Sequence, residues 1–97
     1  MIVLVKKRIA EYGSNNPYAI KSLNHWYIIV NGSDWQNIAE MKYTFNNVDY
    51  VGNDRYVFNI KGNKYRLVAM IFFDKRTVYI RFIGTHQEYN EINCSKI

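Results

Sequence analysis

The chain has a single cysteine, a single proline and no long hydrophobic run. With Cys94 alone, no internal disulfide can form, and the reducing cytoplasm is the expected compartment. The apolar opening, Met1–Val5, is far shorter than the roughly 20 residues of a membrane span and lacks the basic-then-apolar order of a signal peptide. We therefore expect a cytoplasmic protein without membrane contact, whose first residues, 1–6, form a buried strand.

Metal-binding and nucleotide-binding motifs are also missing. The two histidines, the cysteine and the scattered carboxylates show no metal-ligand spacing. The chain has no glycine-rich phosphate loop and no Gly-x-Ser-x-Gly nucleophile elbow. We therefore expect no metal site and no cofactor, and nothing pairs His25 with a nucleophile.

Hydrophobic residues make up 48% of the 97 residues and aromatic residues 16%. A chain of this length supports one core, so residues 1–97 are expected to form a single domain. The formal net charge is +5, and eight of the thirteen lysines and arginines follow Asn53. A basic surface of this kind favours polyanionic partners, such as nucleic acid or anionic membranes, without choosing among them.

The first half of the chain has helical periodicity. Three helices are expected, over residues 7–12, over residues 17–30, and from Ser33 or Asp34 to Met41 or Lys42. Residues 13–16 break the first helix, and Asn16 can cap the second, with Pro17 at its first position.

The second half has strand periodicity. Strands are expected over residues 56–60, 64–73 and 77–84, followed by a short helix or turn over 86–92 and a loose tail over 93–97. The sequence therefore predicts an α+β fold, with N-terminal helices packed on one face of a small antiparallel β-sheet.

A turn at Gly62-Asn63 would set the strand register. It pairs Asn59 with Arg66 and leaves an apolar face for burial under the helices. In the last strand, Val78, Ile80 and Phe82 are then expected on the buried side. Tyr79, Arg81 and Ile83 are expected beside Arg66 on the other side.

This second face carries the chemistry. Arg66 and Arg81 would converge near His86, with Tyr89 one helical turn later. Such a set suits RNA cleavage without a metal, because the 2′-hydroxyl attacks the adjacent phosphate while cations stabilise the charge and an acid–base group moves the protons. Which residue is base and which is acid stays open. Five further residues of the second face are candidates for RNA binding: Arg55, Asn59, Lys61, Lys64 and Tyr79.

Two segments carry a family resemblance. Residues 56–68, Tyr-Val-Phe-Asn-Ile-Lys-Gly-Asn-Lys-Tyr-Arg-Leu-Val, and residues 78–89, Val-Tyr-Ile-Arg-Phe-Ile-Gly-Thr-His-Gln-Glu-Tyr, together resemble the signature half of HigB toxins of the RelE superfamily. The resemblance implies a RelE-like fold, cleavage of mRNA on translating ribosomes, and a HigA-like helix-turn-helix antitoxin that forms a hetero-oligomer with the toxin. Six positions of this chain fall on the motif: Asn59, Lys64, Arg66, Arg81, His86 and Tyr89.

The chain departs from the family pattern at two positions. Lys61 stands where relatives usually have glycine in the turn, and Asn90 stands where an aspartate is usual. Two other functions stay open at this point. Related ParE-type toxins share the fold and inhibit DNA gyrase by contact, and a basic sheet face can also belong to a non-toxic RNA-binding protein.

Overall fold

A computed structural model describes all residues, 1–97, and confirms the α+β class. Its elements in chain order are β1 (Ile2–Leu4), α1 (Lys7–Asn15), α2 (Pro17–Asn31), α3 (Ile38–Thr44), β2 (Asp49–Gly52), β3 (Arg55–Ile60), β4 (Tyr65–Phe72), a 3-10 turn (Phe73–Lys75), β5 (Thr77–Thr85) and α4 (His86–Asn90). No helix combines the length and apolar composition that a membrane span requires.

The five strands form one sheet in the order β1-β5-β4-β3-β2. All neighbours are antiparallel except β1, which runs parallel to β5. The sheet is therefore mixed, whereas the sequence predicted an antiparallel one. β1 was predicted to be a buried strand. It lies instead at one edge of the sheet, and its residue Ile2 is 59% exposed. β2 was not predicted, since its four residues have no apolar alternation.

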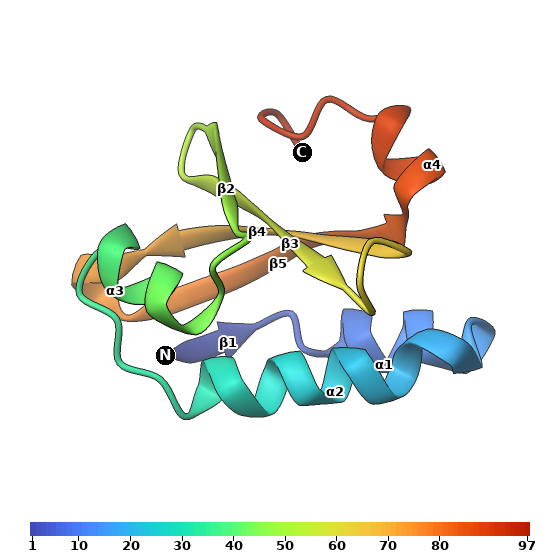
Figure 1. Ribbon diagram of the computed structural model, residues 1–97, viewed down its shortest axis with the longest axis horizontal. Coiled ribbons are helices and arrows are strands. Elements are labelled where there is room, and N and C mark those ends of the chain that lie inside the picture. Colours follow the sequence, from blue (N-terminus) through green and yellow to red (C-terminus); the bar gives the residue numbers. More distant parts are fainter.

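The helices α1 and α2 lie along one face of the sheet, and α4 with the last residues of the chain lies on the other side (Figure 1). The core forms between α2 and the β3–β4 hairpin. Trp26 of α2 meets Phe58 of β3 edge to face, with ring centroids 5.4 Å apart, and Leu23 and Leu67 are fully buried nearby. Burial of this apolar face holds the hairpin in one register.

The junction of α1 and α2 differs from its predicted form. α1 continues through Gly13 to Asn15 rather than breaking there. Asn16 does not cap α2 with its side chain, because that side chain already donates to the carbonyl oxygen of Tyr12 at 3.0 Å. Pro17 is the first residue of α2, as predicted.

The start of α3 was also predicted wrongly. The helix begins at Ile38, and its cap is Asn37, whose side-chain oxygen accepts from the Glu40 N–H at 3.0 Å. Ser33 instead donates to the carbonyl oxygen of Ile29, and Asp34 forms an ion pair with Arg76 at 2.6 Å. Both predicted caps are therefore occupied by other partners.

The β3–β4 register is the predicted one, with Asn59 opposite Arg66 and Phe58 opposite Leu67. The β4–β5 pairing contains a bulge between Val68 and Ala69, which face Phe82 and Ile80. Arg81 is the additional residue in β5. Each later residue of β5 therefore points to the side of the sheet opposite to the one that strict alternation predicts.

The prediction for Phe82 and Ile83 was consequently wrong. Ile83 lies opposite Leu67 on the helix side and packs against the core. Phe82 lies opposite Val68 on the second face. A strict two-residue alternation cannot anticipate a bulge, which inserts one residue into only one strand of the pair.

Residues 93–97 were predicted to form a loose tail. They instead fold back over the second face of the sheet (Figure 1). Arg55 donates to the main-chain oxygen of Ile97 from Nε at 3.0 Å and from Nη2 at 2.6 Å. Asn53 donates to the carbonyl oxygen of Ser95 at 2.9 Å. Val57 and Val68, which point to this face, are 2% and 0% exposed. The second face is therefore covered in its middle.

Gly13 tests the packing of α1 on α2. A Cβ at this position would lie 2.1 Å from Cδ1 of Ile20 and 3.1 Å from its Cβ. We expect Gly13→Ala to lower the free energy of unfolding by about 1–2 kcal/mol, because the cost of overpacking exceeds the gain in helix propensity. Urea unfolding measures the change. Ser14→Ala, at an exposed position of the same helix, is the control with little effect, and a more stable Gly13→Ala protein would contradict the packing.

Candidate functional site

Arg66 occupies the centre of the candidate site, near one end of the sheet. In the strand pairing it lies between Asn59 of β3 and Gly84 of β5. Its guanidinium carbon is 4.9 Å from the ring centroid of Tyr89, and Nη2 donates to the side-chain oxygen of Asn63 at 3.0 Å. The Nε atom is buried and has no hydrogen-bond partner. Unpaired buried donors are rare in native proteins and call for a functional or structural explanation.

Tyr89 lies in α4 and packs its ring against the Arg66 guanidinium. Its hydroxyl donates to the sulfur of Cys94 at 3.4 Å. Burial, together with Cys94, raises the pKa of Tyr89 to about 12, although the charge of Arg66 acts in the opposite direction. The phenol therefore keeps its proton at neutral pH, where it can donate a hydrogen bond but cannot serve as a base.

His86 is the first residue of α4. The helix start is fixed by a reciprocal capping arrangement, in which the Thr85 hydroxyl accepts from the Glu88 N–H at 3.1 Å and Glu88 Oε1 accepts from the Thr85 N–H at 2.8 Å. The main-chain N–H of His86 also donates to the carbonyl oxygen of Lys64 at 3.2 Å. These contacts hold the imidazole at the end of the sheet that carries Arg66.

The His86 ring is oriented by its own helix. Nδ1 lies 3.2 Å from the side-chain nitrogen of Asn90, four residues later. Because an amide nitrogen only donates, Nδ1 is the acceptor in this contact. The neutral ring then carries its proton on Nε2, which is free to meet a substrate.

Arg81 and Tyr79 lie on the same face as Arg66 but farther along the sheet. They border a separate depression of about 350 Å³, together with Met70, Phe72, Lys75 and Thr77. The Val68–Phe82 pair separates this depression from Arg66 in the strand ladder. Arg81 is exposed and has no hydrogen-bond or ion-pair partner within the chain. The two arginines therefore share a face, but the bulge does not place them side by side as predicted.

Two of the predicted RNA-binding residues lie near Arg66, and two have other partners. Lys64 and Asn59 are exposed near Arg66 and His86. Arg55 is bound to the main-chain oxygen of Ile97. Lys61 turns to the helix side, where Nζ donates to the carbonyl oxygen of Tyr18 at 3.1 Å.

Lys61 also shows why a glycine suits its position. Its φ is 54°, in the left-handed region where a side chain is strained and glycine is not. Sequence reasoning assigned no part in the site to Asn63 or Cys94. Both lie close in sequence to predicted site residues, but their contacts depend on the turn and on the folded-back C-terminal residues.

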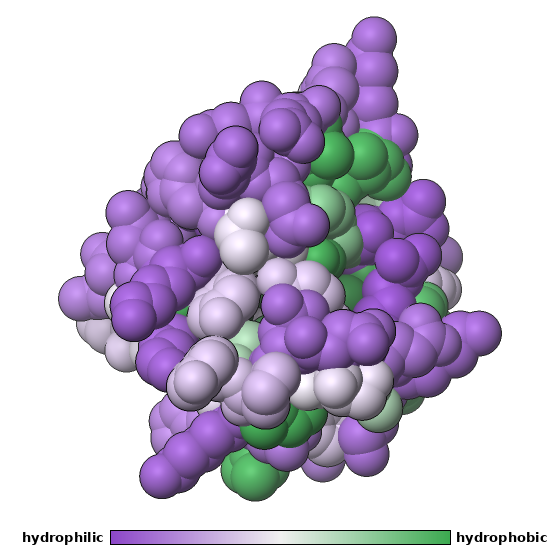
Figure 2. Space-filling model, turned by 90° about the vertical axis from the view of Figure 1, so that its right-hand side faces the viewer, coloured by the Kyte–Doolittle hydropathy of each residue, from purple (hydrophilic) through white to green (hydrophobic).

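The end of the molecule that carries α4 and the β3–β4 turn is mostly hydrophilic, with small hydrophobic patches (Figure 2). No group of three or more His, Cys, Asp or Glu side chains is arranged to hold a metal ion. The second face of the sheet instead offers two arginines, a lysine, an imidazole and a protonated phenol. Such groups bind phosphate oxygens and transfer protons.

Comparison with known proteins identifies the family. Residues 19–92 match the model of the HigB toxin family, described as the RelE-like toxic component of a toxin-antitoxin system. The mRNA interferase toxin HigB of Escherichia coli (strain K12) is 54% identical over 35 residues, which cover 36% of this chain and 34% of that protein. The mRNA interferase HigB of Shigella flexneri matches to the same extent.

A longer alignment exists with another relative. The mRNA interferase HigB of Escherichia coli O6:H1 is 27% identical over 94 residues, covering 95% of this chain and 91% of that protein. The stronger matches thus span only about a third of the relatives' length, whereas the family model spans residues 19–92. The chain belongs to the HigB toxin family, the RelE-like toxic components of toxin-antitoxin systems.

Proposed function

We propose that this chain is a toxin that cleaves mRNA on the ribosome, acting in the cytoplasm as an endoribonuclease. The observation that carries the proposal is the contact of Arg66 with Tyr89 beside His86 at one end of the sheet. The printed names of its relatives, mRNA interferase HigB, support the same activity.

The site chemistry fits attack by the RNA 2′-hydroxyl. The 2′-oxygen forms a bond to the adjacent phosphorus while its proton passes to a base, and the bond from phosphorus to the 5′-oxygen breaks as that oxygen takes up a proton. The products are a cyclic 2′,3′-phosphate and a free 5′-hydroxyl, so no oxidant, reductant or water is consumed.

Each side chain has a part in this step. The Arg66 guanidinium stabilises the negative charge that builds up on the phosphate oxygens. His86 exchanges protons through Nε2, because Nδ1 is held by Asn90. Tyr89 supports the Arg66 guanidinium with its ring.

The separation of Arg81 from Arg66 suits an extended substrate. A single RNA strand lying along the second face can place one phosphate at Arg66 and another nucleotide at the depression of Tyr79 and Arg81. The exposed positions of Lys64 and Asn59 allow contacts with flanking phosphates and sugars. Tyr79 provides a ring on which a base can stack.

The family description implies an antitoxin partner. We propose that the partner is a HigA-like helix-turn-helix protein that binds the toxin in a hetero-oligomer. The resemblance of residues 56–68 and 78–89 to HigB toxins supports this assignment.

Removal of the charged or proton-transferring groups tests the activity. We expect His86→Gln and Arg66→Ala to reduce transcript cleavage by about 10²-fold or more, the usual contribution of one acid–base or charge-stabilising group. Sequencing of RNA 5′ ends after a brief pulse of expression measures the cleavage. Lys42→Ala, at an exposed position of α3, is the control with unchanged activity.

Two results would contradict the proposal. One is undiminished growth arrest and cleavage in both variants. The other is growth arrest with DNA damage and no new RNA ends, which would identify a gyrase-type inhibitor on the same fold.

The ionisation of Tyr89 tests its part as a protonated donor. Cys94→Ala removes the sulfur that accepts from the Tyr89 hydroxyl. Because this contact adds to burial in raising the pKa of Tyr89, we expect the pKa to fall below about 12 in the variant. NMR titration of ring-labelled tyrosine measures the shift.

Tyr12 is the internal control for that titration. Burial and the Glu88 carboxylate raise the pKa of Tyr12 to about 12, and neither depends on Cys94. The pKa of Tyr12 should therefore stay unchanged in Cys94→Ala. If the pKa of Tyr89 does not move, the sulfur contact does not contribute to its raised pKa.

A further inference from the structure

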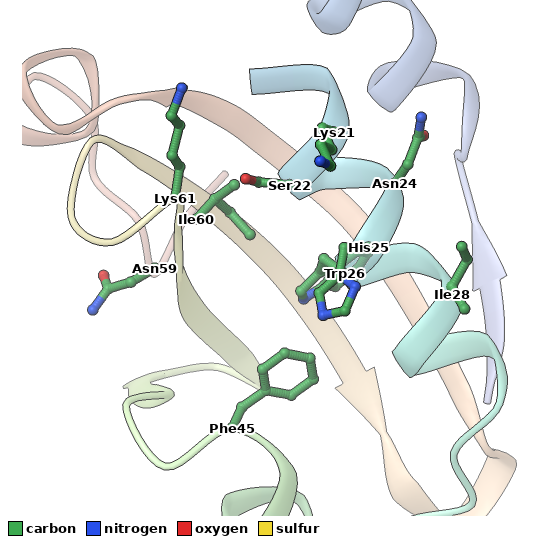
Figure 3. Close-up of a pocket in the computed structure, with 10 residues that line it drawn as sticks. All are labelled: Lys21, Ser22, Asn24, His25, Trp26, Ile28, Phe45, Asn59, Ile60 and Lys61. Atoms are coloured by element: carbon green, nitrogen blue, oxygen red, sulfur yellow. The ribbon is translucent and has the colours of Figure 1, made fainter. Parts of the chain in front are cut away.

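The largest cavity of the molecule lies away from Arg66 and His86. It is a groove of about 570 Å³ between α2 and the end of β3, closed at one end by Phe45 (Figure 3). Its lining residues come mainly from α2 and from the last part of the hairpin strand: Lys21, Ser22, Asn24, His25, Trp26, Ile28, Phe45, Asn59, Ile60 and Lys61. None of the proposed catalytic residues borders it.

One wall of the groove is an unpaired strand edge. β2 pairs with β3 only at Arg55, Tyr56 and Val57. Residues 58–60 pair with β4 on one side and have no strand on the other. No main-chain hydrogen bond joins them to the loop at 45–48. Residues 44–48 lie beside Phe58 and Asn59 on this side and leave a depression of about 250 Å³ between them, where an added strand from another chain can pair once these residues move aside.

An unpaired donor lies beneath the wall of the groove. The indole nitrogen of Trp26 is buried and has no hydrogen-bond partner, and Trp26 as a whole is only 2% exposed, so an acceptor reaches this nitrogen only when the side chains above it move. Figure 3 shows Trp26 at the inner wall of the groove, beside His25 and opposite Phe45. An indole N–H can only donate, so the missing partner is an acceptor such as a carbonyl or carboxylate oxygen.

The charge and the apolar surface of the groove indicate what it binds. Lys21 and Lys61 lie on its rim, and no carboxylate lines it. Ile28 is 67% exposed at the helix wall. The aromatic rings of the groove, Trp26 and Phe45, are packed edge to face against Phe58 and do not present open faces for base stacking. An acidic peptide with an apolar side chain fits these features better than RNA does.

We propose that an extended, acidic segment of the antitoxin docks in this groove and adds a strand to the free edge of β3. The proposal rests on membership of a toxin-antitoxin family and deepens the proposed function by assigning the partner's docking surface. The segment pairs with residues 58–60, covers Ile28 with an apolar side chain, places a carboxylate near Lys21 and supplies an acceptor to the Trp26 indole. The inhibitor thus binds on the helix side of the sheet, and RNA binds on the opposite face.

Two variants of exposed groove residues test the docking. Ile28→Asp introduces a buried charge into the complex, and Lys21→Glu reverses the charge of the rim. Because neither Ile28 nor Lys21 is among the proposed catalytic or RNA-binding residues, both variants should arrest growth like the native chain when the antitoxin is absent. With the purified antitoxin, we expect each to raise the Kd at least tenfold, as measured by isothermal titration calorimetry.

Two further variants test whether the loss of antitoxin binding is specific to the groove. Ile2→Asp places the same substitution on β1, at the opposite edge of the sheet, where Ile2 is 59% exposed, and it should bind the antitoxin as the native chain does. Trp26→Phe keeps the ring packing and removes only the N–H. It should weaken binding by a factor of about two to ten, the range expected for one hydrogen bond.

Amide hydrogen exchange locates the contact directly. Antitoxin binding should slow the exchange of residues 58–60, and an oligoribonucleotide at the same concentration should not. The proposal is overturned if Ile28→Asp and Lys21→Glu bind the antitoxin with native affinity, or if residues 58–60 gain no protection in the complex. It is equally overturned if only the oligoribonucleotide, or self-association of the chain, protects them. If the native chain does not arrest growth, only the proposed function is contradicted, because the binding measurements do not depend on toxicity.

Discussion

Burial of the β3–β4 hairpin under α2 is the constraint on which the rest of the structure depends. Trp26 and Leu23 from the helix cover Phe58 and Leu67, and a shift by one residue would turn every side chain of the hairpin to the other face. Such a shift would bury Arg66 in the core without a partner, at the cost of an unpaired charge. The apolar face thus determines, from the opposite side of the sheet, where the site can form.

The second face is built differently from the first. A bulge at Arg81 places two successive residues of β5, Arg81 and Phe82, on this side of the sheet. Phe82 pairs with Val68, and Arg81 remains exposed. The last residues of the chain then cover the middle of the face through the bonds of Arg55 to Ile97. What remains open is divided between the end with Arg66 and His86 and the depression with Tyr79 and Arg81. This division matches a ligand that is long and thin, such as a single strand.

The two faces also separate two kinds of recognition. The second face presents cations, an imidazole and a protonated phenol, which suit phosphate chemistry. The groove on the helix side presents a free strand edge, an unpaired indole N–H and an exposed isoleucine, which suit a peptide. The sheet lies between them, and Asn59, which lines the groove and is also exposed near Arg66, is a residue that both partners can reach.

Much of this was accessible from the sequence, and the remainder has identifiable causes. Local composition was sufficient for the α+β class, the start of α2 at Pro17, the β3–β4 register and the grouping of Arg66 with His86 and Tyr89 near the end of the hairpin strands. Each of those features depends on neighbours in the chain, on strand alternation or on turn residues, which act over a few positions.

Tertiary packing decided the features that the sequence alone did not. The bulge at Arg81, the cap at Asn37 and the return of residues 93–97 over the sheet all depend on partners far away in the chain. Apolar periodicity is local, and it was therefore sufficient to predict which residues share a strand and that the N-terminal helices cover one face of the sheet. Only the folded structure decided which of the two arginines lies beside Tyr89, because one inserted residue in β5 changes the side and the distance of every contact beyond it.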